Sequence, residues 1–177
     1  MKIELVQYGA LPYVLVGGRP LVCLVTSRET KRWIIPKGWA ETGRTATEVA
    51  CNEAREEAGI VGTISDQALG CYEYRKKLHV FSYAPCRVRV YALNAEHQLR
   101  DWPERRRRQL AWLDPMEAAG LVAERGLANL IIGFGLSGQA RQRHATGARA
   151  PGAYAAGGAA RRSPKLPPTA DDPKGIP

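Results

Sequence analysis

The stretch 33–60 constrains the fold of this chain most, because it predicts a short apolar strand, a glycine-containing loop and a helix in immediate succession. Pro36 ends the strand, since proline cannot donate a ladder hydrogen bond. Thr45 and Glu48 have the spacing of a capping box, and Gly59 stands where a helix that begins at this box should end. The stretch therefore predicts a helix that is anchored at both ends and follows directly on a strand and its loop.

Short strands and helices continue on both sides of this stretch without a regular strand–helix alternation. The expected strands are 11–16, 21–26, part of 62–74, 85–93 and 111–113, and the expected helices follow Asp114 and occupy 121–136. The first two strands are joined by a turn-rich linker over 17–20, which is typical of a hairpin. This mixture predicts an α+β sandwich.

The composition changes near Ser137, beyond which large apolar side chains are scarce and Ala, Gly, Pro and Arg dominate. Such a segment cannot bury enough apolar surface to offset the entropy lost on ordering. We therefore expect one folded domain over 1–140 and a disordered basic tail over 141–177. Of the net charge of +9, the tail holds +5, which a solvated end explains better than nucleic-acid binding does.

The spacing of the cysteines and the length of the apolar runs indicate the cellular compartment in which the protein is expected. The four cysteines are far apart, contain no CxxC pair and are expected as small core or strand residues: Cys23, Cys51, Cys71 and Cys86. This spacing argues against a zinc site or a disulfide framework and favours a reducing, cytoplasmic location. No apolar run approaches the roughly 18 residues of a spanning helix, and the first residues do not resemble a signal peptide, so no membrane association is expected.

Three glutamates of the expected helix are placed for metal chemistry. Glu53, Glu56 and Glu57 share one face, because residues three and four apart are neighbours on a helix. Clustered carboxylates repel one another, and hard oxygen ligands of this kind are what Mg²⁺ or Mn²⁺ requires. The alternative is a solvated acidic face paired with nearby basic side chains.

The segment 38–60 resembles the Nudix box, and the lead-in Trp33–Lys37 is similar to the family as well. The positions that match its spacing are Gly38, Glu53, Ala54, Glu56, Glu57, Gly59 and Ile60. The resemblance extends loosely over residues 5–135 and implies a Nudix-type α/β/α sandwich with a mixed sheet and a catalytic loop-helix.

Two positions depart from the Nudix pattern. Arg44 stands where the pattern has its first glutamate, and Asn52 stands where it has arginine. In the family these two side chains tend to pair, so their joint loss indicates a coupled change. Arg44 could pair instead with Glu48 or Glu41. The metal-binding face itself is intact.

The resemblance implies a metal-dependent hydrolase of diphosphate bonds with Mg²⁺ or Mn²⁺ as cofactor. Glu53 and Glu57 would bind the metal with the backbone carbonyl of Lys37, and Glu56 would act as metal ligand or as general base for water. A metal that bridges phosphate oxygens neutralises charge and orients the attack, while a carboxylate takes the proton of the water.

The substrate is expected to be a phosphorylated small molecule. Ser27 and Arg28 resemble the phosphate-gripping segment of the diphosphoinositol polyphosphate branch, and the Pro-Lys-Gly lead-in also occurs in diadenosine polyphosphate hydrolases. Arg75, Lys76 and Lys77 form a second basic cluster, which could hold phosphates or be a solvated hairpin turn. The run 105–108 is interpreted as a solvated loop.

Two other functions remain open at this point. The chain could be a Nudix-fold regulatory module that holds a nucleotide with weak or no hydrolysis, which the departures at Arg44 and Asn52 would favour. A third hypothesis, an RNA-end pyrophosphohydrolase that uses the basic tail, predicts that deletion of 141–177 removes salt-sensitive RNA affinity. The sequence leaves the oligomeric state open.

Overall fold

A computed structural model describes the backbone of residues 5–79 and 82–145, and side chains over 5–76 and 83–137. The elements along the described chain are β1 (Leu5–Val16), β2 (Arg19–Thr26), β3 (Trp33–Ile34), β4 (Lys37–Trp39), α1 (Ala46–Ala58), β5 (Ile60–His79), β6 (Ser82–Gln98), β7 (Leu110–Leu113), α2 (Pro115–Leu121) and α3 (Arg125–Ala145). Among these residues no helix is both long and apolar enough to cross a bilayer.

The described strands form one mixed sheet with the order β3-β2-β1-β6-β5, to which β4 and β7 add pairings with β1 and β2. The pairing of β1 with β6 is parallel, and the other strand pairs are antiparallel. One edge of β1 pairs with β4 along its first half and with β2 along its second half. This split edge brings the short strand β4 beside the centre of the sheet.

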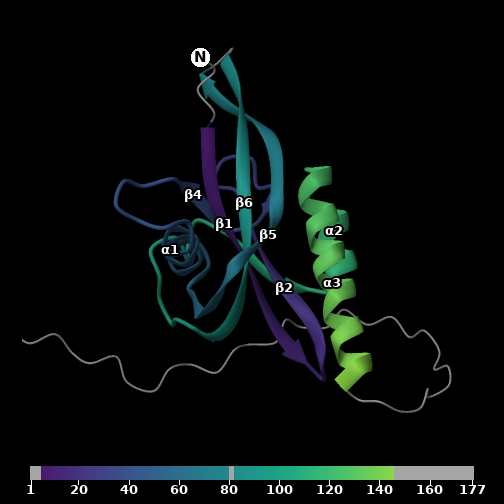
Figure 1. Ribbon diagram of the computed structural model, residues 1–177. Helices are drawn as coiled ribbons and strands as arrows, with labels where there is room; N and C mark the ends of the chain where they lie inside the picture. Colours follow the sequence, from purple (N-terminus) through teal and green to yellow (C-terminus); the bar gives the residue numbers. More distant parts are fainter. Residues whose placement is uncertain (1–4, 80–81, 146–177) are drawn as a thin grey trace, which may run out of the picture.

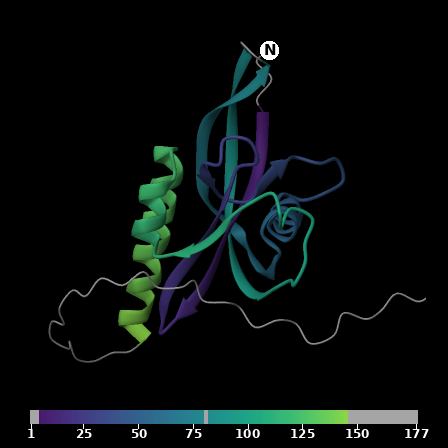
Figure 2. The same cartoon turned by 180° about the vertical axis from the view of Figure 1, so that it is seen from behind.

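Helices cover both faces of the sheet, with α1 on one side and α2 and α3 on the other (Figure 1; Figure 2 shows the same arrangement from behind). Successive residues of a strand point to opposite faces. Accordingly Ala10 and Cys23 belong to the core under α1, whereas Leu11 and Leu24 belong to the core under α2 and α3. The predicted α/β/α sandwich with a mixed sheet is therefore confirmed.

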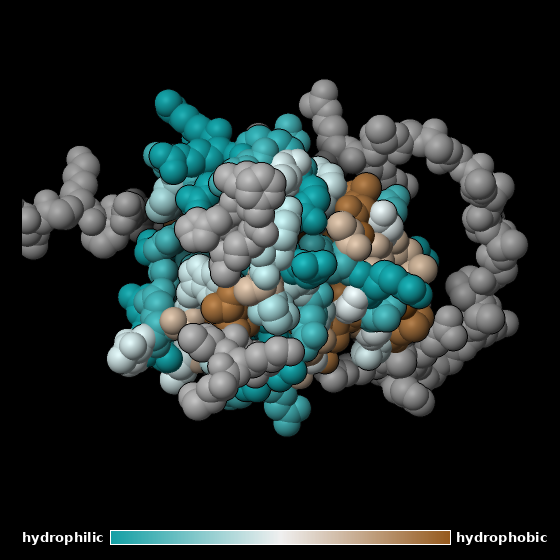
Figure 3. Space-filling model, turned by 90° about the horizontal axis from the view of Figure 1, so that it is seen from above, coloured by the Kyte–Doolittle hydropathy of each residue, from teal (hydrophilic) through white to brown (hydrophobic). Residues whose placement is uncertain are grey.

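The two outer sides of the molecule differ in polarity. Seen from above, hydrophobic surface gathers on the side of α2 and α3, while the opposite side is mostly hydrophilic (Figure 3). Met116, Leu121 and Leu136 are exposed large apolar side chains on those two helices. The hydrophilic side carries α1 and the loops around it.

Most expected elements are present, with four differences. β1 begins at Leu5, six residues before the expected start at residue 11. The strand β4 was not predicted, since three residues around a glycine carry too little periodicity. β5 and β6 form a far longer hairpin than expected, with bulges near Gly62 and Gly70. α3 continues to Ala145, five residues beyond the expected domain boundary at 140. The expected disorder over 146–177 lies outside the described residues and stays a prediction.

Candidate metal centre

Local sequence fixes both ends of α1. The backbone N–H of Thr45 donates to Glu48 Oε2 at 2.7 Å, and the N–H of Glu48 donates to Thr45 Oγ1 at 3.2 Å, which completes the predicted capping box. Gly59 adopts φ 67° at the other end, where its N–H bonds back to the last turn. An N-cap of this kind stabilises a helix by about 1 kcal/mol. Because Ala50 and Ala54 are small and fully buried, the helix packs close to the sheet.

The close packing of α1 brings Glu53 onto β4. A Cβ atom added to Gly38 would lie 1.8 Å from Glu53 Oε1 and 2.9 Å from its Cγ. No residue other than glycine therefore leaves room for this carboxylate beside the strand. The glycine of the predicted loop is required here for close approach.

Glu57 lies one turn further along the helix and is buried. Its Oε2 accepts a hydrogen bond from the backbone N–H of Lys37 at 3.3 Å. Its Oε1 forms an ion pair with the guanidinium of Arg108. Glu53 and Glu57, the two glutamates expected to bind a metal, thus lie beside two consecutive residues of β4.

The interpretation of 105–108 as a solvated loop is wrong for Arg108, whose side chain is only 5% exposed. Its Nε pairs with Glu104 and its Nη1 donates to the carbonyl oxygen of Thr26 at 2.9 Å. The loop folds back because Trp102 packs on Gly59 and the N–H of Glu104 donates to the Glu56 carbonyl at 3.1 Å.

Arg105, in contrast, is mostly exposed, with Asp101 at 3.9 Å. The run of four arginines thus contains at least one buried member, and sequence alone could not identify it. The one signal was Glu104, four residues before Arg108, at a spacing that allows an ion pair on a helical turn.

Glu56 is directed differently from its neighbours. Asn52 Nδ2 donates to Glu56 Oε1 at 2.9 Å, along the same helix. Glu56 still contributes to the electrostatics, because burial raises the pKa of Glu53 and the negative charges of Glu56 and Glu104 raise it further. Asn52, a departure from the Nudix pattern, thus orients the candidate base.

Burial raises the pKa of Glu57 to about 7, against the opposing effect of Arg108 and with a further increase from Glu53. A buried carboxylate is costly unless a cation compensates its charge. Hard carboxylate oxygens beside a backbone strand suit Mg²⁺ or Mn²⁺. The residues present therefore fit such an ion, although the described side chains do not already form a group of three acids, histidines or cysteines close enough to hold one.

The predicted phosphate-binding residues do not gather in one place. Arg28 reaches the centre, where its Nη1 lies 3.5 Å from Glu104 Oε1. Ser27 instead closes its own turn, with Oγ 2.7 Å from Thr30 Oγ1. Lys76 lies over the ring of Trp39 at 6.0 Å, next to β4.

Arg75 stands over Tyr83, on the other face of β5, as strand alternation requires. Lys77 is in β5, and its side chain lies outside the described residues. The predicted basic cluster of three is therefore divided between the two faces of the sheet, and only Lys76 is shown beside β4.

A polar group on the face of the sheet under α3 was missed. Burial lowers the pKa of Lys37, whose ammonium lies 5.3 Å from the ring of Tyr74, and the charge of Lys76 lowers it further. Among the described residues, the buried atoms Tyr72 Oη and Glu124 Oε2 have no hydrogen-bond partner. The alternation of Tyr72, Tyr74 and Lys76 in β5 was the available signal, but it needed β4 and α3 to become a cluster.

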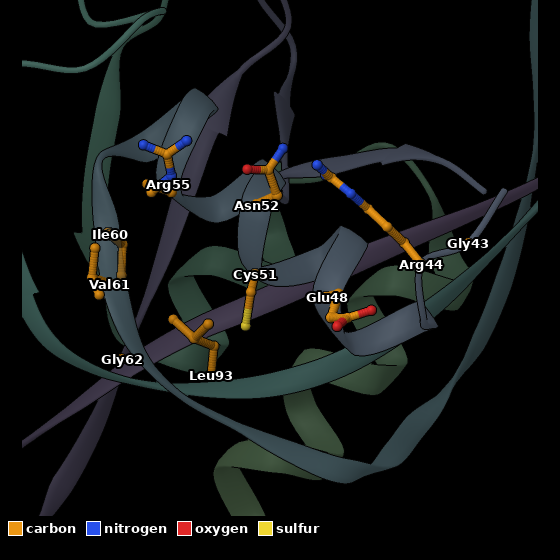
Figure 4. Close-up of a pocket in the computed structure, with 10 residues that line it drawn as sticks. All are labelled: Gly43, Arg44, Glu48, Cys51, Asn52, Arg55, Ile60, Val61, Gly62 and Leu93. Carbon is orange, nitrogen blue, oxygen red and sulfur yellow. The ribbon is translucent and has the colours of Figure 1, made fainter. Parts of the chain in front are cut away.

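A hollow of about 450 Å³ lies on the flank of α1 that faces away from Glu53 and Glu57 (Figure 4). Arg44 and Arg55 extend from different ends of it, with Asn52 between them, and neither Glu53 nor Glu57 lines it. Arg44 pairs with Glu41 at 3.2 Å, one of the two partners expected for it. The two departures from the Nudix pattern therefore have separate partners, Glu41 for Arg44 and Glu56 for Asn52.

Comparison with known proteins agrees with this geometry. No protein-family model matches the chain. Nudix hydrolase 12, mitochondrial, of Arabidopsis thaliana is 36% identical over 103 residues, which is 56% of this chain and 51% of the relative. The chain spans about half the length of the first curated relatives it matches.

Solved structures show the same fold at low identity. A C. elegans Ap4A hydrolase matches with a TM-score of 0.54 and 18% identity, over 75% of this chain and 96% of that one. The E. coli dihydroneopterin triphosphate pyrophosphohydrolase matches with a TM-score of 0.54 and 17% identity, over 77% and 99%. This chain shares with them a mixed sheet between two layers of helices, and here the glutamates of α1 lie beside Gly38 of β4. This arrangement is the Nudix class of fold. The chain belongs to the Nudix hydrolase family.

Proposed function

We propose that the protein is a divalent-metal-dependent hydrolase that cleaves a diphosphate bond in a phosphorylated small molecule. The observation that carries the proposal is the placement of Glu53 and Glu57 beside Lys37 and Gly38, with Glu57 buried. Glu53, Glu57 and the Lys37 carbonyl would hold Mg²⁺ or Mn²⁺. When bound, the ion supplies charge neutralisation at the phosphate oxygens.

The protein's own residues would supply the remaining steps. Glu56 is the candidate base, and Asn52 holds its carboxylate through one oxygen, which leaves the other free for a water proton. Arg28 supplies positive charge beside Glu104, and Lys76 supplies it beside β4. Trp39, 42% exposed, offers an aromatic face beside Lys76.

Arg28 beside Glu104 and Lys76 beside β4 favour a substrate with many phosphates, either a diphosphoinositol polyphosphate or a dinucleoside polyphosphate. One of the fold neighbours is named an Ap4A hydrolase, which supports inclusion of dinucleoside polyphosphates among the candidates. The cytoplasmic location belongs to the same proposal and stays a prediction. So does a tail that is dispensable for fold and catalysis, expected over 141–177, of which α3 already includes 141–145.

The alternative is a regulatory module that binds a phosphorylated ligand and hydrolyses it weakly or not at all. The specific observation in its favour is that Arg108 already neutralises Glu57, the residue on which metal binding would depend.

A screen of phosphorylated compounds tests the proposal. Released phosphate is measured with Mg²⁺, Mn²⁺ or a chelator, on wild type and on Glu57→Gln, with Glu117→Gln on the exposed part of α2 as matched control. We expect metal-dependent release that Glu57→Gln reduces by at least about a hundredfold, in the range seen when one group that stabilises the transition state is lost. Binding without turnover in every metal would favour the regulatory alternative instead.

A further inference from the structure

Arg108 lies next to the candidate metal centre with a side chain that is only 5% exposed. It comes from the loop between β6 and β7, and its guanidinium contacts three groups, of which one is in the same loop and two belong to other elements. These contacts are the carboxylates of Glu57 and Glu104 and the carbonyl oxygen of Thr26. A planar guanidinium with several fixed donors can bridge such partners simultaneously, whereas an ammonium cannot.

The contacts leave Glu57 without a free oxygen. Lys37 donates its N–H to Oε2, and Arg108 pairs with Oε1. Arginine stays charged at any physiological pH. A divalent cation that binds Glu57 must share Oε2 with the Lys37 N–H or compete with Arg108 at Oε1. In either position it lies close to the guanidinium, and two cations close together in a buried place repel strongly.

We propose that Arg108 is a positioning residue that Glu57 exchanges for the metal ion. In the metal-free protein it keeps Glu57 and Glu104 close together despite their like charges, and metal entry displaces the guanidinium from Glu57. The inference rests on the proposed function in one respect, that Glu57 is a metal ligand. Its consequence is unusual for a buried ion pair, because removal of the arginine should strengthen metal binding.

The test is Mn²⁺ binding to the full chain without substrate, followed by the electron paramagnetic resonance signal of free Mn²⁺. Arg108→Gln should bind Mn²⁺ at least threefold more tightly than wild type, and Arg108→Lys should fall between them. Arg28→Gln is the matched control, because Arg28 also approaches Glu104, at 3.5 Å, but its side chain is 58% exposed and it does not pair with Glu57. We expect Arg28→Gln to change the affinity by less than half as much.

A second measurement needs no substitution at Arg108. In wild type labelled with ¹⁵N, the Nη2–H resonances of Arg108, whose nitrogen contacts Glu57, should shift and exchange faster with solvent as Mg²⁺ saturates the site. Resonances that stay unchanged at saturation would overturn the proposal that the metal replaces Arg108 at Glu57, even if Arg108→Gln fails to fold.

The remaining outcomes separate the two proposals. Mn²⁺ affinity that is equal or weaker in Arg108→Gln, while Glu57→Gln still abolishes binding, overturns only the inference and leaves Arg108 a structural support. Equal effects of Arg28→Gln and Arg108→Gln on Mn²⁺ affinity also overturn the inference, since the loss of one positive charge near the site would then explain both. Wild type that binds no Mn²⁺, or Glu57→Gln that binds as wild type does, removes the metal centre and the inference together.

Discussion

The two flanks of α1 carry charged residues under opposite conditions. On the flank that faces β4, Glu57 is buried and each of its oxygens has a partner from another part of the chain. On the flank that faces the hollow of Figure 4, Arg44 is close to half exposed and pairs with Glu41 only three residues away. Exposed pairs contribute about 0–1 kcal/mol, whereas breaking a buried pair costs several. From this difference we expect substitutions to cost more on the flank that faces β4 than on the flank that faces the hollow.

The largest effect is expected where backbone and carboxylate approach most closely. Gly38→Ala would place a Cβ atom 1.8 Å from Glu53 Oε1, so the flexible end of Glu53 must move while the strand stays in place. We expect hydrolysis to fall by about a hundredfold, the scale for a misplacement of about 1 Å at a reacting centre, with little change in melting temperature. Steady-state rates and thermal unfolding measure the two.

Gly120→Ala provides the control, because a Cβ atom there meets nothing within 4 Å. Unaltered turnover in Gly38→Ala would mean that Glu53 does not need its place beside β4, and the contrast between the flanks would be lost.

The second prediction concerns pH. The folded state raises the pKa of Glu57 from 4.5 to about 7, mainly through burial. Well below pH 4.5 Glu57 is protonated in both states. Between pH 4.5 and about 7 it ionises in the unfolded state first, so a rising pH favours the unfolded state, and this effect levels off above the folded pKa. The free energy of unfolding of wild type should therefore fall relative to that of Glu57→Gln between pH 4.5 and 7.5.

Urea unfolding of both proteins in a chelator, at several pH values, measures this difference. Saturating Mg²⁺ should reduce the slope, because the ion compensates the buried charge. A difference that is constant across this pH range would show that Arg108 outweighs burial at Glu57.

The smallest effect is expected on the other flank. Arg44→Glu would set a second carboxylate next to Glu41, and Asn52→Arg would replace the amide that orients Glu56. The double variant should recover what the single variants lose, by the ion pair that the Nudix pattern has at these positions. We expect coupling of roughly 0–1 kcal/mol, less than about fivefold in rate or Mg²⁺ dependence.

A double-mutant cycle on turnover gives the coupling directly. Additive effects would show that Arg44 and Asn52 act separately here, in agreement with their separate partners. Coupling as large as the effect of Gly38→Ala would instead make the exposed flank part of the site.

The sequence by itself determined the features that depend on residues close together in the chain. The capping box, the glycine at the end of α1 and the first hairpin all follow from spacings of a few residues, and the structure contains each of them. The sandwich was predicted for the same reason, because alternating and helical periodicities are local properties. The roles of Glu53, Glu56 and Glu57 in metal binding and catalysis stay predictions.

Only the tertiary structure decided which charges meet. Arg108 differs from Arg105 because the loop that carries both folds back over Gly59 and buries one of them. Lys76 differs from Arg75 because β5 extends through both and strand alternation divides them between the faces of the sheet. The physical reason is that burial sets the strength of a charge interaction, and burial depends on segments that are far apart in the sequence.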